Sequence, residues 1–261
     1  MNSIEALFLG LVQGLTEFLP VSSSGHLVVF GSLLGLEADG NLLFEVGVHV
    51  ASLLAIAIFY RQKILELVRG IFAAKPGAIE YVGKLVVATL PAVAVALGLN
   101  GVLDRVLSSP EIAAVGLLLT SLILWTTRST LPRATGLVPG WGAALLIGVA
   151  QALAILPGVS RSGSTVAVAL ALGIAPAAAA EFSFLMGIIA ISSAAVLMLP
   201  DLGQASPEAL ASLALGCATA LGSGILAIWL FVVVLRRQTF YQFAYYTFAV
   251  GTAFGLYLLL G

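Results

Sequence analysis

Long apolar runs alternate with short polar stretches along the whole chain, and six of the runs approach the length of a membrane-spanning helix. A helix needs about twenty predominantly apolar residues to cross the hydrocarbon core of a bilayer. The pattern therefore predicts an all-α polytopic membrane protein that forms one membrane domain over residues 1–261. The predicted spans are residues 42–60, 85–103, 112–127, 176–199, 209–235 and 240–260.

Two further apolar segments are interrupted by polar and turn-forming residues and are too short on either side of the break to cross. Residues 4–36 are broken by LPVSSSGH at 19–26, and residues 140–173 are broken by LPGVSRSGST at 156–165. Irregular backbone at membrane depth is tolerated only where it is buried in protein or lines a wet cavity. Each segment is therefore predicted to form a re-entrant helical hairpin with a polar tip.

The order of these elements repeats, because a hairpin and three spans make up residues 1–128 and again residues 139–261. Three is an odd number of crossings, so the second repeat is predicted to be inverted relative to the first, with the two hairpin tips able to meet. The repeats share short matches at a constant separation: GLVQ (10–13) with GVAQ (148–151), and VSSSG (21–25) with VSRSG (159–163).

Composition agrees with a membrane protein and excludes several other classes. Of the 261 residues, 61% are hydrophobic and 9% are charged, whereas soluble domains carry about 25% charged residues. The net charge of −1 provides no basic stripe for nucleic acid. Cys217 is the single cysteine, which excludes a disulfide framework and a thiolate metal site.

The basic residues predict the orientation in the membrane. If the chain crosses the membrane at the predicted spans, Arg105 lies on one side of the membrane and the other basic connections lie on the opposite side. The positive-inside rule assigns that more basic side to the cytoplasm. Both termini and the entrance of the first hairpin are then predicted to face outward. The basic residues on the cytoplasmic side lie in residues 61–84 and at Arg128, Arg133, Arg236 and Arg237.

Arg161, in the second tip, is the basic residue left within the membrane by this threading. An arginine at the bilayer centre costs about 2.5–3.5 kcal/mol on insertion scales and is usually paired or functional. One interpretation is a structural partner for Glu17 or Glu45. The other is that its planar guanidinium binds an anionic ligand bidentately, and phosphate fits that geometry best.

The composition of both tips favours phosphate over a carboxylate ligand. Backbone N–H groups near Gly25 and Gly163 are expected at helix N-termini, which attract anions. Many hydroxyls at two facing tips suggest a ligand with many oxygens, such as a diphosphate; the alternative is that the serines cap helices and turn the chain. The hydroxyl donors are Ser22, Ser23, Ser24, Ser160, Ser162, Ser164 and Thr165.

Acidic and imidazole groups lie beside the first tip. Gln13 and Glu17 are four residues apart and share a helical face. A carboxylate next to a diphosphate suggests a bridging Mg²⁺ or Ca²⁺, or an acid/base role for Glu17; a salt bridge to Arg161 is the alternative. His26 can exchange a proton or attack phosphorus, or merely cap and pack. Glu45 and His49, also four apart, are weaker candidates for residues that support the site from around it; the alternative is that they are only a polar lining of a wet cavity.

Together these residues resemble the undecaprenyl-diphosphate phosphatase family, also called the bacitracin-resistance family. QGLTEFLPVSSSGH at 13–26 is similar to the first motif of that family, and PGVSRSGST at 157–165 is similar to the second. The resemblance also covers the order of elements and the segment around Glu45. Many members have glutamate at the position of Gln13, and a neutral amide there leaves more of the acid/base and metal role to Glu17.

The resemblance implies hydrolysis of a C55 polyprenyl diphosphate to the monophosphate carrier lipid used in cell-wall synthesis. It implies a divalent cation and a site that opens to the outer face of the bacterial cytoplasmic membrane. Partners would be the lipid substrate, membrane lipid and a second copy of the chain as a homodimer. Catalytic residues would be Glu17, Ser23, His26 and Arg161, with Ser23, His26 or water as the nucleophile. Substrate contacts would come from Gln13, Ser22, Ser24, Gly25, Glu45, Ser160, Ser162, Gly163 and Thr165.

A transporter or flippase for polyprenyl phosphate is the rival function. Inverted repeats with broken helices at the midplane are also the plan of many secondary transporters. The pairing of His26 with Glu17 favours an enzyme, because transport alone would not require it.

Overall fold

A computed structural model describes residues 2–34, 42–98, 106, 109–197 and 207–260, and this part of the chain is helical, without a β-strand. The helices are α1 (Ser3–Phe18), α2 (Ser23–Leu34), α3 (Leu42–Phe59), α4 (Arg61–Phe72), α5 (Pro76–Gly98), α7 (Pro110–Thr130), α8 (Trp141–Leu153), α9 (Arg161–Ala171), α10 (Pro176–Leu197), α11 (Pro207–Arg236) and α12 (Phe243–Leu260), with short 3-10 helices η2 (Leu131–Arg133) and η4 (Phe240–Gln242).

Several of these helices are long and apolar enough to cross a membrane. Within the described residues, four qualify individually, and a fifth span results if the bent pair of α3 and α4 is taken as one. The chain is therefore an all-helical, multi-pass membrane protein, as predicted. The described apolar part of α10, Pro176–Ala190, is shorter than a full span, and the end of the predicted span 176–199 lies outside the described residues.

The segment after α3 differs from the prediction. Residues 61–84 lie between the predicted spans 42–60 and 85–103, and they form α4, bent by 78° from α3, and the first turns of α5, which begins at Pro76 rather than at residue 85. The charges of these turns are accommodated locally, because Lys84 Nζ lies 2.6 Å from Glu80 Oε1 and 5.8 Å from the Trp141 ring. Residues 99–103 of the predicted span lie outside the described residues.

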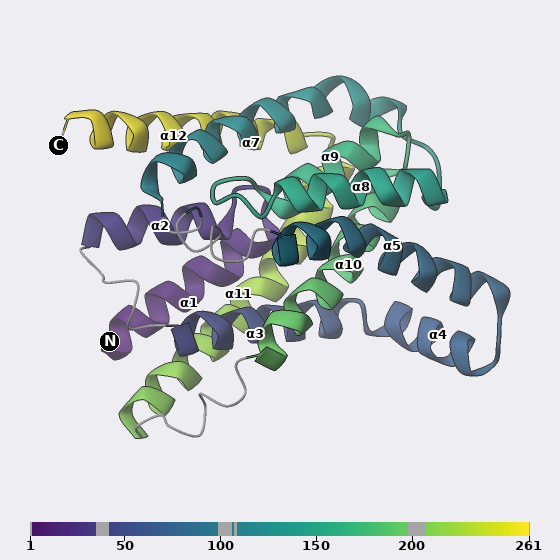
Figure 1. The fold of residues 1–261 in the computed structure, drawn as a ribbon, viewed down its shortest axis with the longest axis horizontal. Coiled ribbons are helices and arrows are strands. Elements are labelled where there is room, and N and C mark those ends of the chain that lie inside the picture. The colour runs from purple at the N-terminus through teal and green to yellow at the C-terminus, as the bar shows by residue number, and fades with distance from the viewer. Residues whose placement is uncertain (1, 35–41, 99–105, 107–108, 198–206, 261) are drawn as a thin grey trace.

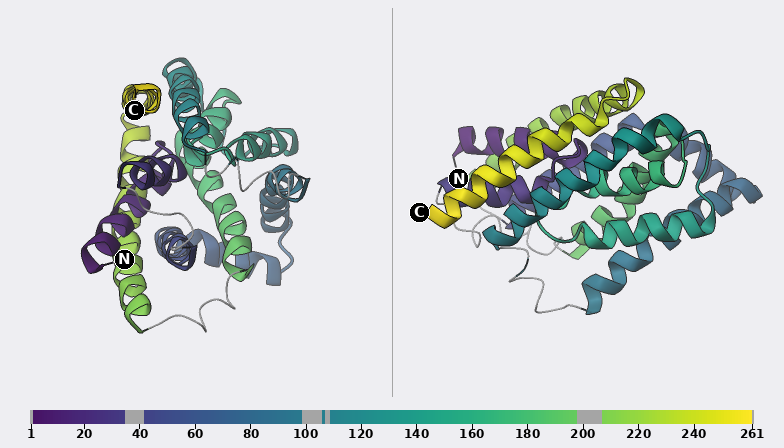
Figure 2. Two further views of the ribbon diagram at one scale, coloured as in Figure 1. Left: turned by 60° about the vertical axis from the view of Figure 1, so that its left-hand side comes forward. Right: turned by 90° about the horizontal axis from the view of Figure 1, so that it is seen from above.

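Each of the two interrupted segments forms a pair of helices that contact each other, and the two halves of the chain interleave around these pairs. The first hairpin consists of α1 and α2, and the second of α8 and α9. Helix α1 packs along α11, α8 packs along α5, and α7 packs along α12 (Figure 1). Each hairpin is thus held by a helix from the other half. The two termini lie at one end of the molecule and the turn from α4 to α5 at the opposite end (Figures 1 and 2).

Small residues allow α1 and α11 to approach closely. A Cβ added to Gly10 would overlap the carbonyl oxygen of Gly216, and one added to Gly14 would overlap that of Ala220. Glycines four residues apart are a common means of close helix packing in membranes, where dispersion contacts replace the hydrophobic effect as the driving force. This contact holds the first hairpin in place.

Replacing Gly14 by alanine is expected to lower the stability of the fold by about 1–3 kcal/mol, because the added methyl group overpacks the α1–α11 contact. Thermal unfolding in detergent micelles measures the effect. Gly222→Ala is the matched control on α11, since a Cβ at Gly222 meets no atom within 4 Å. Equal melting temperatures for the two variants would contradict this packing.

Candidate active site

The two hairpin tips are in direct contact. A Cβ built on Gly25 lies 2.8 Å from the Cα of Gly158, and one built on Gly163 lies 3.2 Å from the Cβ of Pro20. Ser162 Oγ donates across the contact to the carbonyl oxygen of Leu19 at 3.3 Å. Residues 143 positions apart in the chain therefore form one polar centre.

Helix α7 packs against the second tip and holds its backbone through hydrogen bonds. Thr120 Oγ1 donates to the carbonyl oxygen of Gly158 at 2.7 Å and accepts from the backbone N–H of Ser160 at 2.9 Å. Gly158 has φ +84°, a conformation that favours glycine. A Cβ on Gly116 would overlap the carbonyl oxygen of Pro157. Ser160 then caps α9 by accepting from the N–H of Gly163 at 3.1 Å, so α9 begins at Arg161.

The first tip turns at Ser22, whose φ of 71° is unusual for a residue with a side chain. Ser22 Oγ accepts from the backbone N–H of Gly25 at 3.2 Å, and the Ser22 carbonyl oxygen accepts from the N–H of His26 at 3.2 Å. Helix α2 begins at Ser23. The N-termini of α2 and α9 therefore lie at the contact between the tips, and helix N-termini favour anions.

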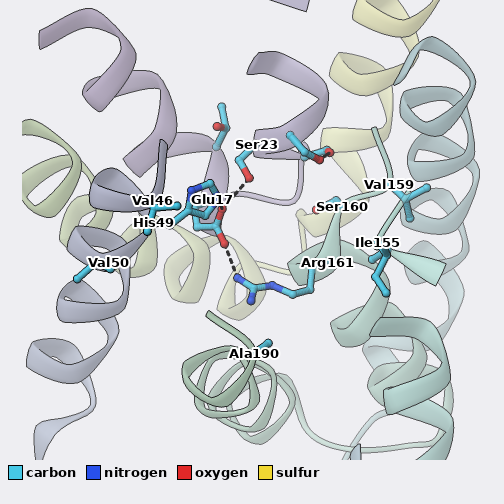
Figure 3. Close-up of a pocket in the computed structure, with 14 residues that line it drawn as sticks. Glu17, Ser23, Val46, His49, Val50, Ile155, Val159, Ser160, Arg161 and Ala190 are labelled. Atoms are coloured by element: carbon cyan, nitrogen blue, oxygen red, sulfur yellow. Dashed lines mark hydrogen bonds and ion pairs between the residues drawn. The ribbon is translucent and has the colours of Figure 1, made fainter. Parts of the chain in front are cut away.

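Glu17 is buried at the centre of this region and contacts residues from both tips (Figure 3). Its Oε1 accepts from the Arg161 guanidinium. Its Oε2 accepts from Ser23 Oγ at 2.6 Å and from Gln13 Nε2 at 3.0 Å, and His49 Nε2 lies 3.8 Å from the same oxygen. The salt bridge to Arg161, one of the two interpretations open from the sequence, is thus present together with a hydroxyl aimed at the carboxylate.

A cavity of about 350 Å³ opens beside Glu17. Six of the expected site residues line it: Glu17, Ser22, Ser23, Ser24, Ser160 and Arg161. The rest of its wall is formed by Thr16 and His49 and by an apolar group that comprises Val46, Val50, Ala154, Ile155, Val159 and Ala190. One part of the wall can therefore hold phosphate oxygens and the other can contact an apolar chain.

Other expected residues surround the cavity without lining it. Gln13 reaches Glu17, Gly25 and Gly163 form the tip contact, and Ser162 lies 3.3 Å from Ser160 Oγ. Thr165 Oγ1 lies 2.6 Å from Ser183 Oγ on α10. Ser164 Oγ is buried and has no hydrogen-bond partner within the described structure. The side chain of Glu45 lies outside the described residues, although its backbone belongs to α3.

His26 also lies outside the cavity wall, and its side chain is buried. Its Nδ1 lies 2.8 Å from the Ser22 carbonyl oxygen, and its Nε2 lies 2.8 Å from the hydroxyl of Tyr246 on α12. Both ring nitrogens therefore have partners within the protein. Ser23 is the better placed of the two expected side-chain nucleophiles.

Comparison with known proteins gives the family. The sequence profile of the family described as "Bacitracin resistance protein BacA" matches residues 6–253, nearly the whole chain. The chain belongs to the BacA family. A relative from Desulfatibacillum aliphaticivorans, named undecaprenyl-diphosphatase, is 37% identical over 96% of this chain and 97% of its own length. Another relative, from Acinetobacter baumannii, has the same name and is 33% identical over 95% of this chain and 93% of its own length.

Several residues that support the site in this BacA-family chain were not identified from the sequence. Thr120, Ser183 and Tyr246 bind the tips from α7, α10 and α12. Gly187 makes room for the Arg161 guanidinium, because its added Cβ would lie 3.1 Å from Nη1. Each lies in an apolar helix without a local motif, so no sequence signal marked it.

His49, a weak candidate from its spacing to Glu45, lines the cavity.

The possible metal ligands around Glu17 are few, so a metal site there would need ligands from substrate phosphates and water. Within the described residues, no group of three or more His, Cys, Asp or Glu side chains could hold an ion. However, the Gln13 amide that donates from Nε2 to Glu17 carries a buried Oε1 without a hydrogen-bond partner. Mg²⁺ is commonly bound by one or two carboxylates, substrate phosphates and water. Glu17 and the Gln13 amide oxygen are therefore the candidate protein ligands of this BacA-family chain for a cation shared with a diphosphate.

Proposed function

We propose that this chain hydrolyses undecaprenyl diphosphate to undecaprenyl phosphate and inorganic phosphate, which recycles the carrier lipid for cell-wall synthesis. Membership of the BacA family and the undecaprenyl-diphosphatase relatives support this activity. The observation that carries it is the Glu17 carboxylate, which joins the Ser23 hydroxyl of one tip to the Arg161 guanidinium of the other at a cavity.

Ser23 is the proposed nucleophile. Its Oγ attacks the terminal phosphorus, the Oγ–P bond forms, and the anhydride P–O bond breaks to release undecaprenyl phosphate. Glu17 takes the hydroxyl proton, a role supported by the 2.6 Å hydrogen bond between them. Water then attacks the phosphorus of the phosphoserine, the Oγ–P bond breaks, the water oxygen leaves as part of inorganic phosphate, and Glu17 returns its proton to Ser23 Oγ. Recovery of a phosphoserine peptide from quenched enzyme supports this route; its absence during turnover would indicate direct attack by water.

The second tip is proposed to bind and neutralise the phosphates. A guanidinium has five N–H donors, and the pair with Glu17 occupies only part of that set. The N-termini of α2 and α9 add backbone donors and the positive ends of their helix dipoles. Stabilising charge on the transferred phosphoryl group is the main contribution that a protein makes to this class of reaction.

We propose that Glu17 and the Gln13 amide oxygen hold Mg²⁺ or Ca²⁺ together with substrate oxygens. The Gln13 amide contacts Glu17 through Nε2 and leaves Oε1 buried without a hydrogen-bond partner, which supports this donor set. When bound, the cation would neutralise charge on the diphosphate. Removing divalent ions with a chelator is expected to stop phosphate release, and adding Mg²⁺ is expected to restore it.

Two inverted repeats, with the site open to the outer face, remain the proposed architecture. The reciprocal packing of α1 on α11 and of α8 on α5 supports it. So does the position of both termini at the end of the molecule opposite the α4–α5 turn (Figure 1). The apolar part of the cavity wall is the proposed start of a lateral path for the isoprenoid tail.

Cysteine labelling tests this orientation. In a Cys217→Ser background, Ala73→Cys introduces an exposed thiol at the α4–α5 turn, and Ser3→Cys introduces one near the N-terminus. A membrane-impermeant thiol reagent is expected to label the Ser3 variant in intact cells and the Ala73 variant only after the inner face is opened. The reverse pattern would overturn the orientation.

Purified protein in liposomes tests the activity against the transporter alternative. With undecaprenyl diphosphate and Mg²⁺ on the outer side, the enzyme is expected to release inorganic phosphate at a rate that scales with protein. Movement of undecaprenyl phosphate between leaflets without any phosphate release would instead support a transporter.

A further inference from the structure

The buried side chain of His26 and the partly exposed side chain of Tyr246 form a contact that joins the first tip to the last helix. Their rings stack with centroids 5.6 Å apart and an interplanar angle of 2°. The Tyr246 hydroxyl lies 2.8 Å from His26 Nε2, and the residues are 220 positions apart in the sequence. Neither residue lines the cavity. The contact therefore has no direct access to a phosphate bound there.

The partners of the imidazole define its hydrogen positions. The Ser22 carbonyl oxygen, 2.8 Å from Nδ1, can only accept, so Nδ1 must carry the hydrogen and donate. In the neutral ring Nε2 is then an acceptor, and the Tyr246 hydroxyl donates to it. The lone pair that a nucleophilic histidine would use is thereby occupied.

His26 stabilises the strained turn at Ser22 in the first tip. Ser22 has φ 71°, and strained conformations of this kind persist where the surrounding contacts enforce them. The Ser22 carbonyl oxygen accepts from both the backbone N–H and the ring Nδ1–H of His26. The next residue is Ser23, whose hydroxyl reaches Glu17 at 2.6 Å. A rotation of the Ser22 peptide would move that hydroxyl away from the carboxylate.

We propose that Tyr246 is a positioning residue: it fixes the orientation and the Nδ1–H tautomer of His26, which in turn holds the Ser22 peptide so that Ser23 is aimed at Glu17. His26 then contributes to the reaction through the shape of the tip and not as a nucleophile. The inference rests on the proposed function, because the reaction step that it supports is the attack by Ser23.

Tyr246→Phe removes the hydroxyl and keeps the stacked ring. We expect about a tenfold lower kcat, the effect of one hydrogen bond, with KM unchanged because neither residue lines the cavity. Tyr245→Phe is the matched control, because Tyr245 is 60% exposed and its ring contacts Trp125 instead of His26. Melting temperatures of both variants are measured in parallel. A Tyr246→Phe enzyme with the kcat of the wild type would overturn the proposal.

Variants of His26 distinguish a positioning role of this residue from a role as nucleophile. The Asn amide in His26→Asn can still donate to the Ser22 carbonyl oxygen but has no equivalent of Nε2. We expect His26→Asn to retain clearly more activity than His26→Ala, and adding Tyr246→Phe to His26→Asn to cause no further loss of kcat. Asparagine as inactive as alanine, or an acid-labile phosphohistidine trapped from the wild type, would contradict the proposal.

A spectroscopic measurement separates this proposal from the proposed function. ¹⁵N NMR of histidine-labelled protein is expected to show the Nδ1–H tautomer for His26, with the Nε2 signal shifted in Tyr246→Phe and unchanged in Tyr245→Phe. An Nε2–H tautomer in the wild type would refute the inference, whatever the activity. If the tautomer is as expected but the wild type releases no phosphate, the proposed function fails instead.

Discussion

Replacing Ser23 by alanine is expected to lower kcat for hydrolysis of undecaprenyl diphosphate by at least about 10⁴-fold, because the variant lacks the attacking oxygen. The Ser23 hydroxyl lines the cavity and donates to Glu17 Oε2 at 2.6 Å. KM is expected to change little, since Arg161 and the helix N-termini still bind the phosphates. Steady-state release of inorganic phosphate in detergent measures both constants.

Ser24 provides the matched control for this prediction. It also lines the cavity, but its hydroxyl lies 3.3 Å from Ser22 Oγ and not at Glu17. Ser24→Ala is expected to lose less than about tenfold in kcat, the size expected for one neutral hydrogen bond. Comparable losses in the two variants would show that Ser23 has no special role among the hydroxyls of the tip.

Replacing Arg161 by alanine is expected to lower kcat/KM by about 10³-fold or more. An arginine that stabilises a transferred phosphoryl group typically contributes 10³–10⁵ in rate. Loss of the guanidinium also leaves the buried Glu17 carboxylate without its cationic partner, so the melting temperature is expected to fall as well. Phosphate release and thermal unfolding are therefore measured on the same preparation.

Arg161→Lys distinguishes the contribution of the positive charge at this position from that of the planar guanidinium geometry. Lysine keeps the positive charge but lacks the planar fork, so it is expected to recover stability while remaining well below the wild-type rate. Arg133→Ala, an exposed arginine in η2, is the control that is expected to leave the rate unchanged. A lysine variant with full activity would mean that the guanidinium acts only as a nearby charge.

The sequence predicted the two helix breaks well because their signals are local. Proline, glycine and serine interrupt apolar helices at 19–26 and at 156–165, and the structure has helix breaks at both places. A meeting of the tips was predicted from an odd number of crossings in each repeat, and the tips are in contact. Glu17, Ser23 and Arg161 could be identified as site candidates because charged and hydroxylic residues are costly in an apolar region.

What sequence reasoning missed depends on residues that are distant in the chain. Tyr246 and Thr120 lie in apolar helices and acquire their roles from partners 220 and 40 positions away. The charged residues of 61–84 suggested a connection, yet local pairing such as Lys84 with Glu80 allows helix there. The spacing of His26 relative to the tip suggested chemistry, whereas its placement depends on how α12 packs.

One measurement tests most directly whether the two tips act on the same phosphoryl group. Phosphate release from undecaprenyl diphosphate is compared for the wild type, Ser23→Ala, Arg161→Gln and the double variant. If the two side chains serve one transition state, the double variant is expected to be about as slow as the slower single variant, because residues that act as a unit are strongly non-additive. A double variant whose loss equals the product of the two single losses, or a single variant with the wild-type rate, would contradict the account.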